Sequence, residues 1–215
     1  MGRLVVIEGL DGAGKRTVAA ALTKALHEEG ASVAMLAFPR YGRSVHADFI
    51  REALHREHGD LGESVYGMGV LYALDRRGAL DELNAALRDN DVLLLDRYVA
   101  SNAAYGAARL HQDAHGEFVK WVRELEIARF GLPVPDTQIL LRVSPEVAAE
   151  RAERRARSEV DRARDVFETD DDLQVRCAAV YDQLAAGSWL SPWRVADGTT
   201  IFDATETARA LVHPG

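Results

Sequence analysis

The sequence has a single cysteine, Cys177, and no long apolar run, and each shortage excludes a class of protein. One cysteine cannot form an internal disulfide, so the chain suits a reducing compartment. No stretch reaches the roughly 18 consecutive apolar residues that a membrane-spanning helix requires. The apolar run at 4–7 is too short for a signal peptide, and we therefore expect a cytoplasmic protein without membrane contacts.

Lysine is also scarce, and acidic residues outnumber basic ones. The formal net charge is -8, and lysine occurs only at positions 15, 24 and 120. A general nucleic-acid binder normally carries a basic excess, so we expect small-molecule substrates and no nucleic acid as partners. The 215 residues, with a mass of 23.6 kDa and a hydrophobic share of 47%, are typical of one globular domain covering 1–215.

The strongest motif that is present is a glycine-rich loop between an apolar run and a helical pattern. Its spacing, Gly9-x4-Gly14-Lys15, is that of a P-loop. Glycines let backbone N–H groups turn toward phosphate oxygens, and the lysine reaches the outer phosphates. Arg16 replaces the hydroxyl residue that usually follows the lysine, and Thr17 comes one place later, so a contact between Thr17 and Mg²⁺ stays an open question. The predicted ATP-binding residues are Gly9, Gly12, Gly14, Lys15, Arg16 and Thr17.

Apolar runs alternate with helical patterns along the chain, which predicts an α/β fold. Short unbroken apolar runs are typical of parallel strands that are buried on both faces. We therefore expect a doubly wound parallel sheet with helices on both sides. The predicted strands are 4–8, 32–38, 92–96, 137–143 and 194–196. The predicted helices are 18–29, 44–55, 61–88, 101–130, 145–157, 168–186 and 205–212.

A polar motif follows the strand predicted at 92–96, at the sheet edge where such folds bind ligands. Asp96 and Arg97 come first, and Asn102 and Tyr105 fall three residues apart on the helix that follows. Alone, Asp-Arg is better explained by a local ion pair. Beside a P-loop, it favours a carboxylate and a guanidinium close to the phosphates.

A second polar motif follows the strand predicted at 32–38. Phe38-Pro39-Arg40-Tyr41 places a rigid proline between an aromatic ring and a cation, which suits a pocket wall beside a charge. A simple loop explains this segment equally well.

A third cluster is rich in arginine although the protein as a whole is acidic. Most charge runs form a solvated helix face, but here the arginines clearly outnumber the acids. The arginines are Arg151, Arg154, Arg155, Arg157, Arg162 and Arg164.

Together and in this order, the motifs resemble those of the thymidylate kinase family. The matching segments are Gly-Leu-Asp-Gly-Ala-Gly-Lys-x-Thr from 9, Phe-Pro-Arg-Tyr from 38, Leu-Tyr-Ala-Leu-Asp-Arg from 71 and Asp-Arg-Tyr-x-x-Ser-Asn-x-Ala-Tyr from 96. The resemblance runs from residue 3 to about 186. It implies a P-loop fold of the nucleoside-monophosphate-kinase type and an enzyme that transfers the γ-phosphoryl group of ATP to dTMP, with Mg²⁺.

The resemblance also implies catalytic roles. Lys15 would serve the outer phosphates of ATP, and Arg97 would bridge the acceptor and transferred phosphates. Bacterial-type members have glycine where this chain has Gly12 and carry the catalytic arginine in a mobile lid. Here the lid corresponds to about 151–165, and we predict that Arg155 acts as an arginine finger.

Metal and sugar contacts are implied in the same way. Asp11 would hold the deoxyribose 3′-hydroxyl and help to position Mg²⁺, with Glu168 as a second acidic neighbour. Tyr105 would crowd the 2′ position and disfavour ribonucleotides.

For the base, Tyr72 would stack on the thymine ring, Arg76 would donate to O4, and Asn102 would pair with N3. Without the resemblance, Tyr72 and Arg76 are better explained as one core aromatic and one solvated arginine on a helix. The remaining residues implied for dTMP are Phe38, Pro39, Arg40, Tyr41, Asp165 and Phe167.

Two other functions remain as alternatives. A deoxynucleoside kinase attacks with a hydroxyl group and needs a carboxylate base near a strand end, where this chain offers Phe38-Pro39-Arg40-Tyr41. A non-enzymatic P-loop regulator would carry a guanine-reading Asn-Lys-x-Asp motif, which is absent.

The family usually forms homodimers, and the helix predicted at 61–88 is a candidate for the contact face. Its apolar side chains are explained equally well by core packing. They are Val65, Val70, Leu74 and Leu83.

Overall fold

The computed structural model describes the backbone of residues 2–158 and 170–213, and the side chains of these residues except 155–158. At its centre is a sheet of five strands in the order β2-β3-β1-β4-β5, with all neighbouring pairs parallel. All five predicted strands are confirmed, with each end within one residue of the prediction. The strands are β1 Arg3–Glu8, β2 Val33–Ala37, β3 Val92–Asp96, β4 Thr137–Arg142 and β5 Trp193–Asp197.

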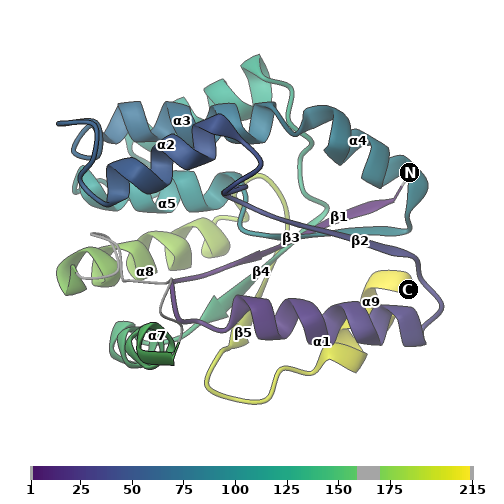
Figure 1. Cartoon of the computed structure of the whole chain (residues 1–215). Coiled ribbons are helices and arrows are strands. Elements are labelled where there is room, and N and C mark those ends of the chain that lie inside the picture. Colours follow the sequence, from purple (N-terminus) through teal and green to yellow (C-terminus); the bar gives the residue numbers. More distant parts are fainter. Residues whose placement is uncertain (1, 159–169, 214–215) are drawn as a thin grey trace.

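Helices cover both faces of the sheet, which confirms the predicted α/β class (Figure 1). In this view α1 and α9 lie below the sheet, whereas α2, α3 and α4 lie above it. No helix in the described ranges combines the length and the apolar character that crossing a bilayer demands. The helices are α1 Lys15–Glu28, α2 Val45–Leu54, α3 Val65–Arg77, α4 Leu80–Asp89, α5 Val99–Arg109, α6 Glu117–Arg123, η1 Glu124–Arg129, α7 Pro145–Ser158, α8 Asp171–Ala186 and α9 Ala204–Val212.

The middle strands are buried on both faces because helices pack on each side. Val5 and Val6 on β1 and Leu94 on β3 have no exposed surface. The edge strands β2 and β5 are more open, with Met35 and Val195 about half exposed. Polar groups of the central strands therefore reach a ligand only where those strands end.

The register brings three strand ends to one edge of the sheet. Asp96, the last residue of β3, pairs with Ile7 of β1 and with Ala37 of β2. The P-loop, the Phe38 segment and the Arg97 segment all leave the sheet at this edge. This is the arrangement in which open α/β sheets bind their ligands.

The single helix predicted at 61–88 is wrong, because two helices occupy this stretch. Ser64 caps α3 by accepting a hydrogen bond from the Gly67 N–H, and the helix ends before Gly78. Beyond Leu74 the bonding pattern changes, because the Ala79 N–H bonds to the Arg76 carbonyl at 3.0 Å. The Asp75 carbonyl accepts a hydrogen bond from Arg40 Nη2 at 2.7 Å.

The single helix predicted at 101–130 is wrong as well. Helix α5 ends at Arg109, and His111 beyond it takes a left-handed conformation with φ at +52°. A turn in which Asp113 accepts a hydrogen bond from the His115 N–H leads to α6. The chain then passes into the π-helical turn η1.

Candidate active site

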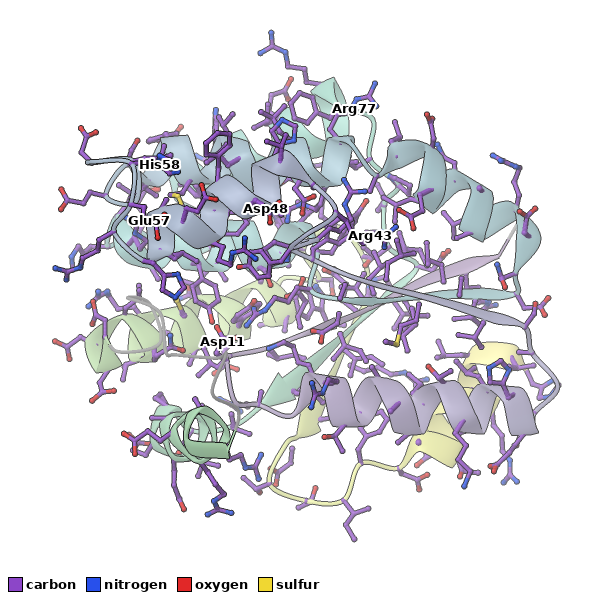
Figure 2. The ribbon with its side chains drawn as sticks, in the orientation of Figure 1. Asp11, Arg43, Asp48, Glu57, His58 and Arg77 are labelled. Carbon is purple, nitrogen blue, oxygen red and sulfur yellow. The ribbon has the colours of Figure 1, made fainter. Side chains whose placement is uncertain are left out.

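A cleft of about 700 Å³ opens at the edge where β1, β2 and β3 end. Every predicted site residue with a described side chain lines it, except Gly9 and Arg40. Asp11, labelled in Figure 2, lies at the end of the sheet from which the P-loop leaves. The lining residues are Asp11, Gly12, Gly14, Lys15, Arg16, Thr17, Ala37, Phe38, Pro39, Tyr41, Arg51, Leu54, His55, Tyr72, Arg76, Asp96, Arg97, Ser101, Asn102, Tyr105, Arg151 and Ala152.

The P-loop between β1 and α1 needs its glycines for two reasons. Gly9, Gly12 and Gly14 all have positive φ angles, of 142°, 84° and 97°, and residues with a side chain rarely adopt such angles. At Gly12 space is also lacking, because a Cβ would lie 2.1 Å from the carbonyl oxygen of Ala148 on α7. The loop therefore packs directly against the helix that carries the predicted lid.

Lys15 folds back over the loop. Its Nζ donates hydrogen bonds to the carbonyl oxygens of Gly9 at 3.1 Å and Leu10 at 2.8 Å. Burial, and next the positive charge of Arg97, lower the pKa of Lys15 to about 8. The ammonium group is thus held at the phosphate end of the cleft, and its partners among the described residues are neutral carbonyl groups.

Arg97 follows β3 in a left-handed backbone conformation, with φ at +65°, which is uncommon for a residue with a side chain. Its Nη2 donates to Asp11 Oδ1 at 2.6 Å, and its Nη1 donates to Ser101 Oγ at 3.1 Å. The guanidinium carbon lies 5.4 Å from the ring centroid of Tyr105, whose hydroxyl donates to Asp11 Oδ2 at 2.9 Å. One carboxylate therefore holds both the cation and the aromatic ring.

The charges in this group depend on one another. Burial would raise the pKa of Asp11, but the charges of Arg97 and Lys15, with the two hydrogen bonds, hold it well below its ordinary value. Burial likewise works against the Arg97 charge, yet Asp11 keeps the pKa of Arg97 well above its ordinary value. Both side chains are consequently charged in the protein without ligands.

Glu8, the last residue of β1, supports this group from behind and was not predicted. Its fully buried carboxylate accepts hydrogen bonds from the Tyr98 N–H at 2.9 Å, Ser101 Oγ at 2.6 Å and Tyr181 Oη at 3.0 Å. Burial raises the pKa of Glu8 despite these bonds. An acid that ends an apolar strand just before a P-loop was the signal available in the sequence.

At the other end of the cleft, Tyr72, Arg76 and Asn102 come together from α3 and α5. Arg76 Nε and Nη2 donate to the two carboxylate oxygens of Glu126 at 2.5 and 2.7 Å. Burial disfavours the charged guanidinium, but Glu126 keeps the pKa of Arg76 above its ordinary value. Asn102 Nδ2 donates to the same carboxylate at 2.8 Å and to the Gly69 carbonyl at 3.1 Å.

Phe38, Pro39 and Tyr41 line the cleft, but Arg40 does not. Its backbone N–H and Nε donate to the Asp75 carboxylate at 2.9 and 3.0 Å. Arg40 thus faces α3, where it holds the loop after β2 against the end of that helix.

Only part of the predicted lid lies within the described residues. Arg151 lines the cleft, and its Nη1 donates to the Gly198 carbonyl at 2.8 Å. Arg154 is exposed and paired with Glu150 at 2.8 Å. The Arg155 backbone belongs to α7, but its side chain is not described. The side chains of Arg157, Arg162, Arg164, Asp165, Phe167 and Glu168 also lie outside the described part.

One carboxylate oxygen in the cleft suits a cation. Asp96 Oδ1 is buried and has no hydrogen-bond partner among the described residues. A buried carboxylate oxygen without a donor is costly unless a cation approaches it. Asp11 and Thr17 line the same cleft, so oxygen ligands of the kind that Mg²⁺ prefers are close to the P-loop.

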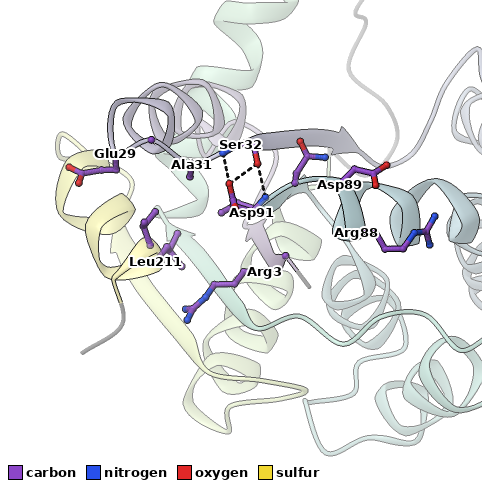
Figure 3. A pocket seen from close by; sticks show the side chains of 13 residues that line it. Arg3, Glu29, Ala31, Ser32, Arg88, Asp89, Asp91 and Leu211 are labelled. Carbon is purple, nitrogen blue, oxygen red and sulfur yellow. Dashed lines mark hydrogen bonds between the residues drawn. The ribbon is translucent and has the colours of Figure 1, made fainter.

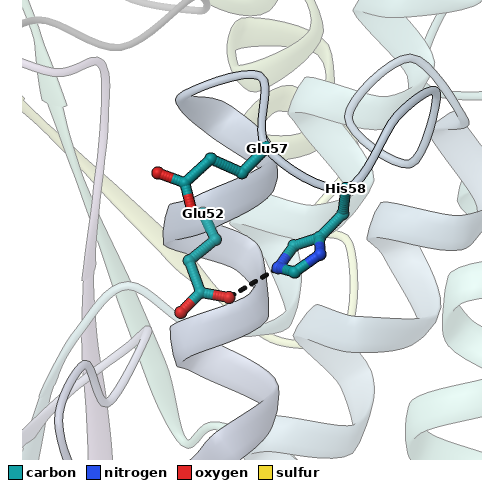
Figure 4. A group of neighbouring side chains, drawn as sticks. All are labelled: Glu52, Glu57 and His58. Atoms are coloured by element: carbon teal, nitrogen blue, oxygen red, sulfur yellow. Dashed lines mark hydrogen bonds and ion pairs between the residues drawn. The ribbon is translucent and has the colours of Figure 1, made fainter.

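A second group of candidate metal ligands lies apart from the cleft. Glu52, Glu57 and His58, at and after the end of α2, bring their ligand atoms within 4.8 Å of one another (Figure 4). Figure 4 shows the hydrogen bond of 2.6 Å between His58 Nε2 and Glu52. None of the three lines the cleft, so they hold no metal for chemistry there.

A second pocket, of about 490 Å³, lies at the opposite end of the sheet (Figure 3). Ser32 and Asp91 cross-link its floor, with both the N–H and the hydroxyl of Ser32 bonded to Asp91 Oδ2. It is lined by acidic and basic side chains in nearly equal number and by no predicted site residue. The cleft at the P-loop is therefore the candidate active site.

Sequence reasoning also missed residues that line the cleft from α2. Arg51, Leu54 and His55 belong to no motif, and their position follows from the packing of α2 over the cleft. Sequence reasoning also did not predict that the loop after β5 lies near the site. A Cβ at Gly198 would lie 3.3 Å from the Ala13 carbonyl of the P-loop, so this loop passes beside it.

Comparison with known proteins places the chain in a family. The family model described as thymidylate kinase matches residues 7–191. A thymidylate kinase of Mycobacterium tuberculosis is 56% identical over 192 residues, which are 89% of this chain and 90% of that protein. A thymidylate kinase of Xanthomonas oryzae is 34% identical over 98% of this chain and 83% of its own length. A probable thymidylate kinase of Archaeoglobus fulgidus is 33% identical over 72% and 71%. This chain therefore belongs to the thymidylate kinase family.

Proposed function

We propose that this enzyme transfers the γ-phosphoryl group of ATP to dTMP and releases dTDP and ADP. The observation that carries the proposal is one cleft that is lined both by the P-loop and by the polar side chains of Arg76 and Asn102. Lys15 and Arg97 line the same cleft. A donor and an acceptor that are both phosphates need cations between them.

The chemistry of the acceptor explains why the cleft needs cations and does not require a general base. The second pKa of a phosphate monoester is about 6, so dTMP is mostly a dianion at neutral pH and already nucleophilic. The barrier then comes from bringing two polyanions together and from charge spread over the transferred group. Lys15 and Arg97 supply fixed positive charge there, and we assign Arg155 as the finger that arrives with the lid.

The Arg97 guanidinium is already held in position in the cleft before phosphates bind. Its bonds to Asp11 and Ser101 hold it in one rotamer, so little conformational entropy is lost on binding. Lys15 donates to two loop carbonyls and would exchange these weak partners for phosphate oxygens. The change of partner replaces neutral acceptors with anions, which bind a buried ammonium more strongly.

Mg²⁺ fits this chemistry, and we assign Asp11 and Glu168 as its acidic neighbours, with Asp96 as a further candidate from the same cleft as Asp11. The cation would neutralise phosphate charge and fix the geometry of the nucleotide. Asp96 contributes the buried oxygen that has no donor among the described residues. Thr17 lies at the cleft wall, where its hydroxyl can replace the one that Arg16 displaces.

For the acceptor nucleoside, we assign Tyr72 to stacking on the thymine, Arg76 to O4 and Asn102 to N3. Tyr105, held by Asp11, is assigned to the space beside the 2′ carbon of the sugar. Phe38 and Pro39 would form the wall, with Tyr41 beside them. Asp165 and Phe167 are assigned to the same pocket.

We also propose that the protein acts as a homodimer through α2 and α3. Val45, Phe49, Tyr66 and Val70 on these helices are each at least 36% exposed, so both helices carry apolar area on the surface of the described part of the chain. Leu83, predicted for this surface, has no exposed area and belongs to the core.

The test of the proposed reaction is product formation. Purified protein with ATP, Mg²⁺ and dTMP should yield dTDP and ADP in equal amounts, and excess EDTA should stop the reaction. Hydrolysis of ATP to ADP without dTDP, or full activity in EDTA, would contradict the proposal.

A further inference from the structure

Glu126 joins the two side chains that are proposed to read the base. Its carboxylate has no exposed surface and binds Arg76 of α3 through two hydrogen bonds of 2.5 and 2.7 Å. One of its oxygens also accepts the 2.8 Å bond from Asn102 of α5. A single buried acid, distant from both residues in sequence, thus connects three elements behind the cleft.

The local fold shows why an acid lies at this position. Phe118, Val122 and Glu126 are spaced by four residues and are all buried, so Glu126 continues the core-facing stripe of α6. The chain turns into the π-helical segment η1 here, with the Phe130 N–H bonded to the Leu125 carbonyl at 2.9 Å. Such π turns are frequent at functional sites. A charge on an apolar stripe is costly unless it has specific partners.

The bonds to Asn102 settle which way its amide points. Nδ2 has two hydrogens, and they are donated to Glu126 Oε1 and to the Gly69 carbonyl. Because both of these partners accept only, the reversed amide would set its own oxygen against two oxygens. Oδ1 is therefore the atom left over, and it has no hydrogen-bond partner in the described ranges. The cleft receives an acceptor from Asn102.

Arg76 is fixed in the same manner. Its Nε and Nη2 are taken by Glu126, which leaves the Nη1 hydrogens without a partner among the residues described here. Arg76 lines the cleft and is only ever a donor. The base site thus presents one donor and one acceptor, and Glu126 holds both in place.

Thymine and cytosine differ at the two atoms concerned. Thymine offers an N3–H donor and an O4 acceptor, whereas cytosine offers an N3 acceptor and a 4-amino donor. The pattern of Arg76 and Asn102 complements thymine at both atoms and opposes cytosine at both. On the proposed assignment of the base site, we infer that Glu126 is a positioning residue that sets selection of thymine over cytosine by fixing the direction of the Asn102 amide.

The experiment is Glu126→Gln, assayed for kcat/KM with dTMP and with dCMP. The glutamine amide offers one acceptor and one donor, so Asn102 is no longer held in one direction. The ratio of kcat/KM for dTMP to that for dCMP should fall about 10- to 100-fold, as expected when a buried polar group loses its proper partner. The KM for ATP should stay unchanged, because the P-loop does not contact Glu126. Both acceptors are measured on one preparation, so loss of folded enzyme cancels in the ratio.

Two further variants separate selectivity from stability. Glu124→Gln alters an exposed acid on the same turn and should leave the ratio unchanged. Glu126→Asp keeps the charge but is one methylene shorter, and should lower the ratio less than Glu126→Gln. It also serves as the test if the glutamine variant does not fold. A lower melting temperature with an unchanged ratio in the Glu126 variants would overturn the inference and leave a structural role only. A wild-type enzyme without preference for dTMP would instead refute the proposed base site.

Discussion

Replacing Lys15 by methionine should abolish phosphoryl transfer and at the same time make the nucleotide-free protein more stable. Lys15 is only 7% exposed, and its ammonium is bonded to two carbonyl groups. Burial and the charge of Arg97 lower its pKa from 10.5 to about 8, although Asp11, Asp96 and Glu8 act in the opposite direction. The charged form is thus disfavoured in the folded state until phosphate arrives.

The size of the effect follows from the pKa. A change from 10.5 to about 8 corresponds to roughly 3 kcal/mol of folding free energy at neutral pH. Methionine removes this cost. It also leaves the Gly9 and Leu10 carbonyls without their donor, which destabilises the folded state by about 1–2 kcal/mol. We expect a net stabilisation of about 1–2 kcal/mol. For a chain of this length, that corresponds to a rise in Tm of roughly 2–8 °C.

The sign of the pH dependence provides a second check. Because the folded pKa is below the unfolded one, the cost is full below pH 8 and disappears as the pH rises toward 10.5. The stability difference between Lys15→Met and wild type should therefore be largest at pH 7 and smaller at pH 10. Denaturant unfolding without nucleotide measures it. Lys24→Met, at an exposed surface pair with Glu28, is the matched control and should change stability by less than about 0.5 kcal/mol. A Lys15→Met protein that is less stable than wild type at pH 7 would refute the reasoning.

Three further predictions concern the lid, the sugar and the assembly. Arg155→Ala should lower kcat by about 10³–10⁵ with little change in the KM for dTMP, whereas its exposed neighbour Arg154→Ala should not; equal effects would remove the finger assignment. Tyr105→Ala should raise kcat/KM for UMP relative to dTMP, and an unchanged ratio would show that another group excludes the 2′-hydroxyl. Val70→Lys should convert the dimer to a monomer in sedimentation equilibrium, and a wild-type protein that is already monomeric would exclude the proposed interface.

The sheet was predictable because its strands carry their own signal. Val92-Leu93-Leu94-Leu95 is an apolar run typical of a strand that is buried on both faces, and polar residues mark its end. Helix ends were harder to predict. At the end of α3, for example, the Asp75 carbonyl accepts a hydrogen bond from the guanidinium of Arg40, which is 35 residues away along the chain. No periodicity within a helix can show such a bond.

In the candidate site, too, the residues with a local sequence signal could be predicted and the others could not. Residues that face the cleft, such as Lys15 and Arg97, lie in motifs with a recognisable spacing. Residues that hold them do not, because their partners are far away along the chain. Glu126 is 50 residues from Arg76, and Glu8 is 173 residues from Tyr181. Arg40 lies in a recognisable motif, yet its side chain bonds to Asp75 and does not line the cleft. A motif position does not determine which way a side chain turns.

The most direct test of the account is a comparison of acceptors with the wild-type enzyme. We would measure kcat/KM by ADP release for dTMP, dUMP, dCMP, UMP and AMP at saturating ATP and Mg²⁺. The account predicts that dTMP is best and that dUMP is slower by roughly 10- to 200-fold, since it lacks a single methyl group. It also predicts that dCMP is poor, because its base opposes both Arg76 and Asn102. An enzyme that prefers dCMP or AMP would contradict the thymidylate assignment.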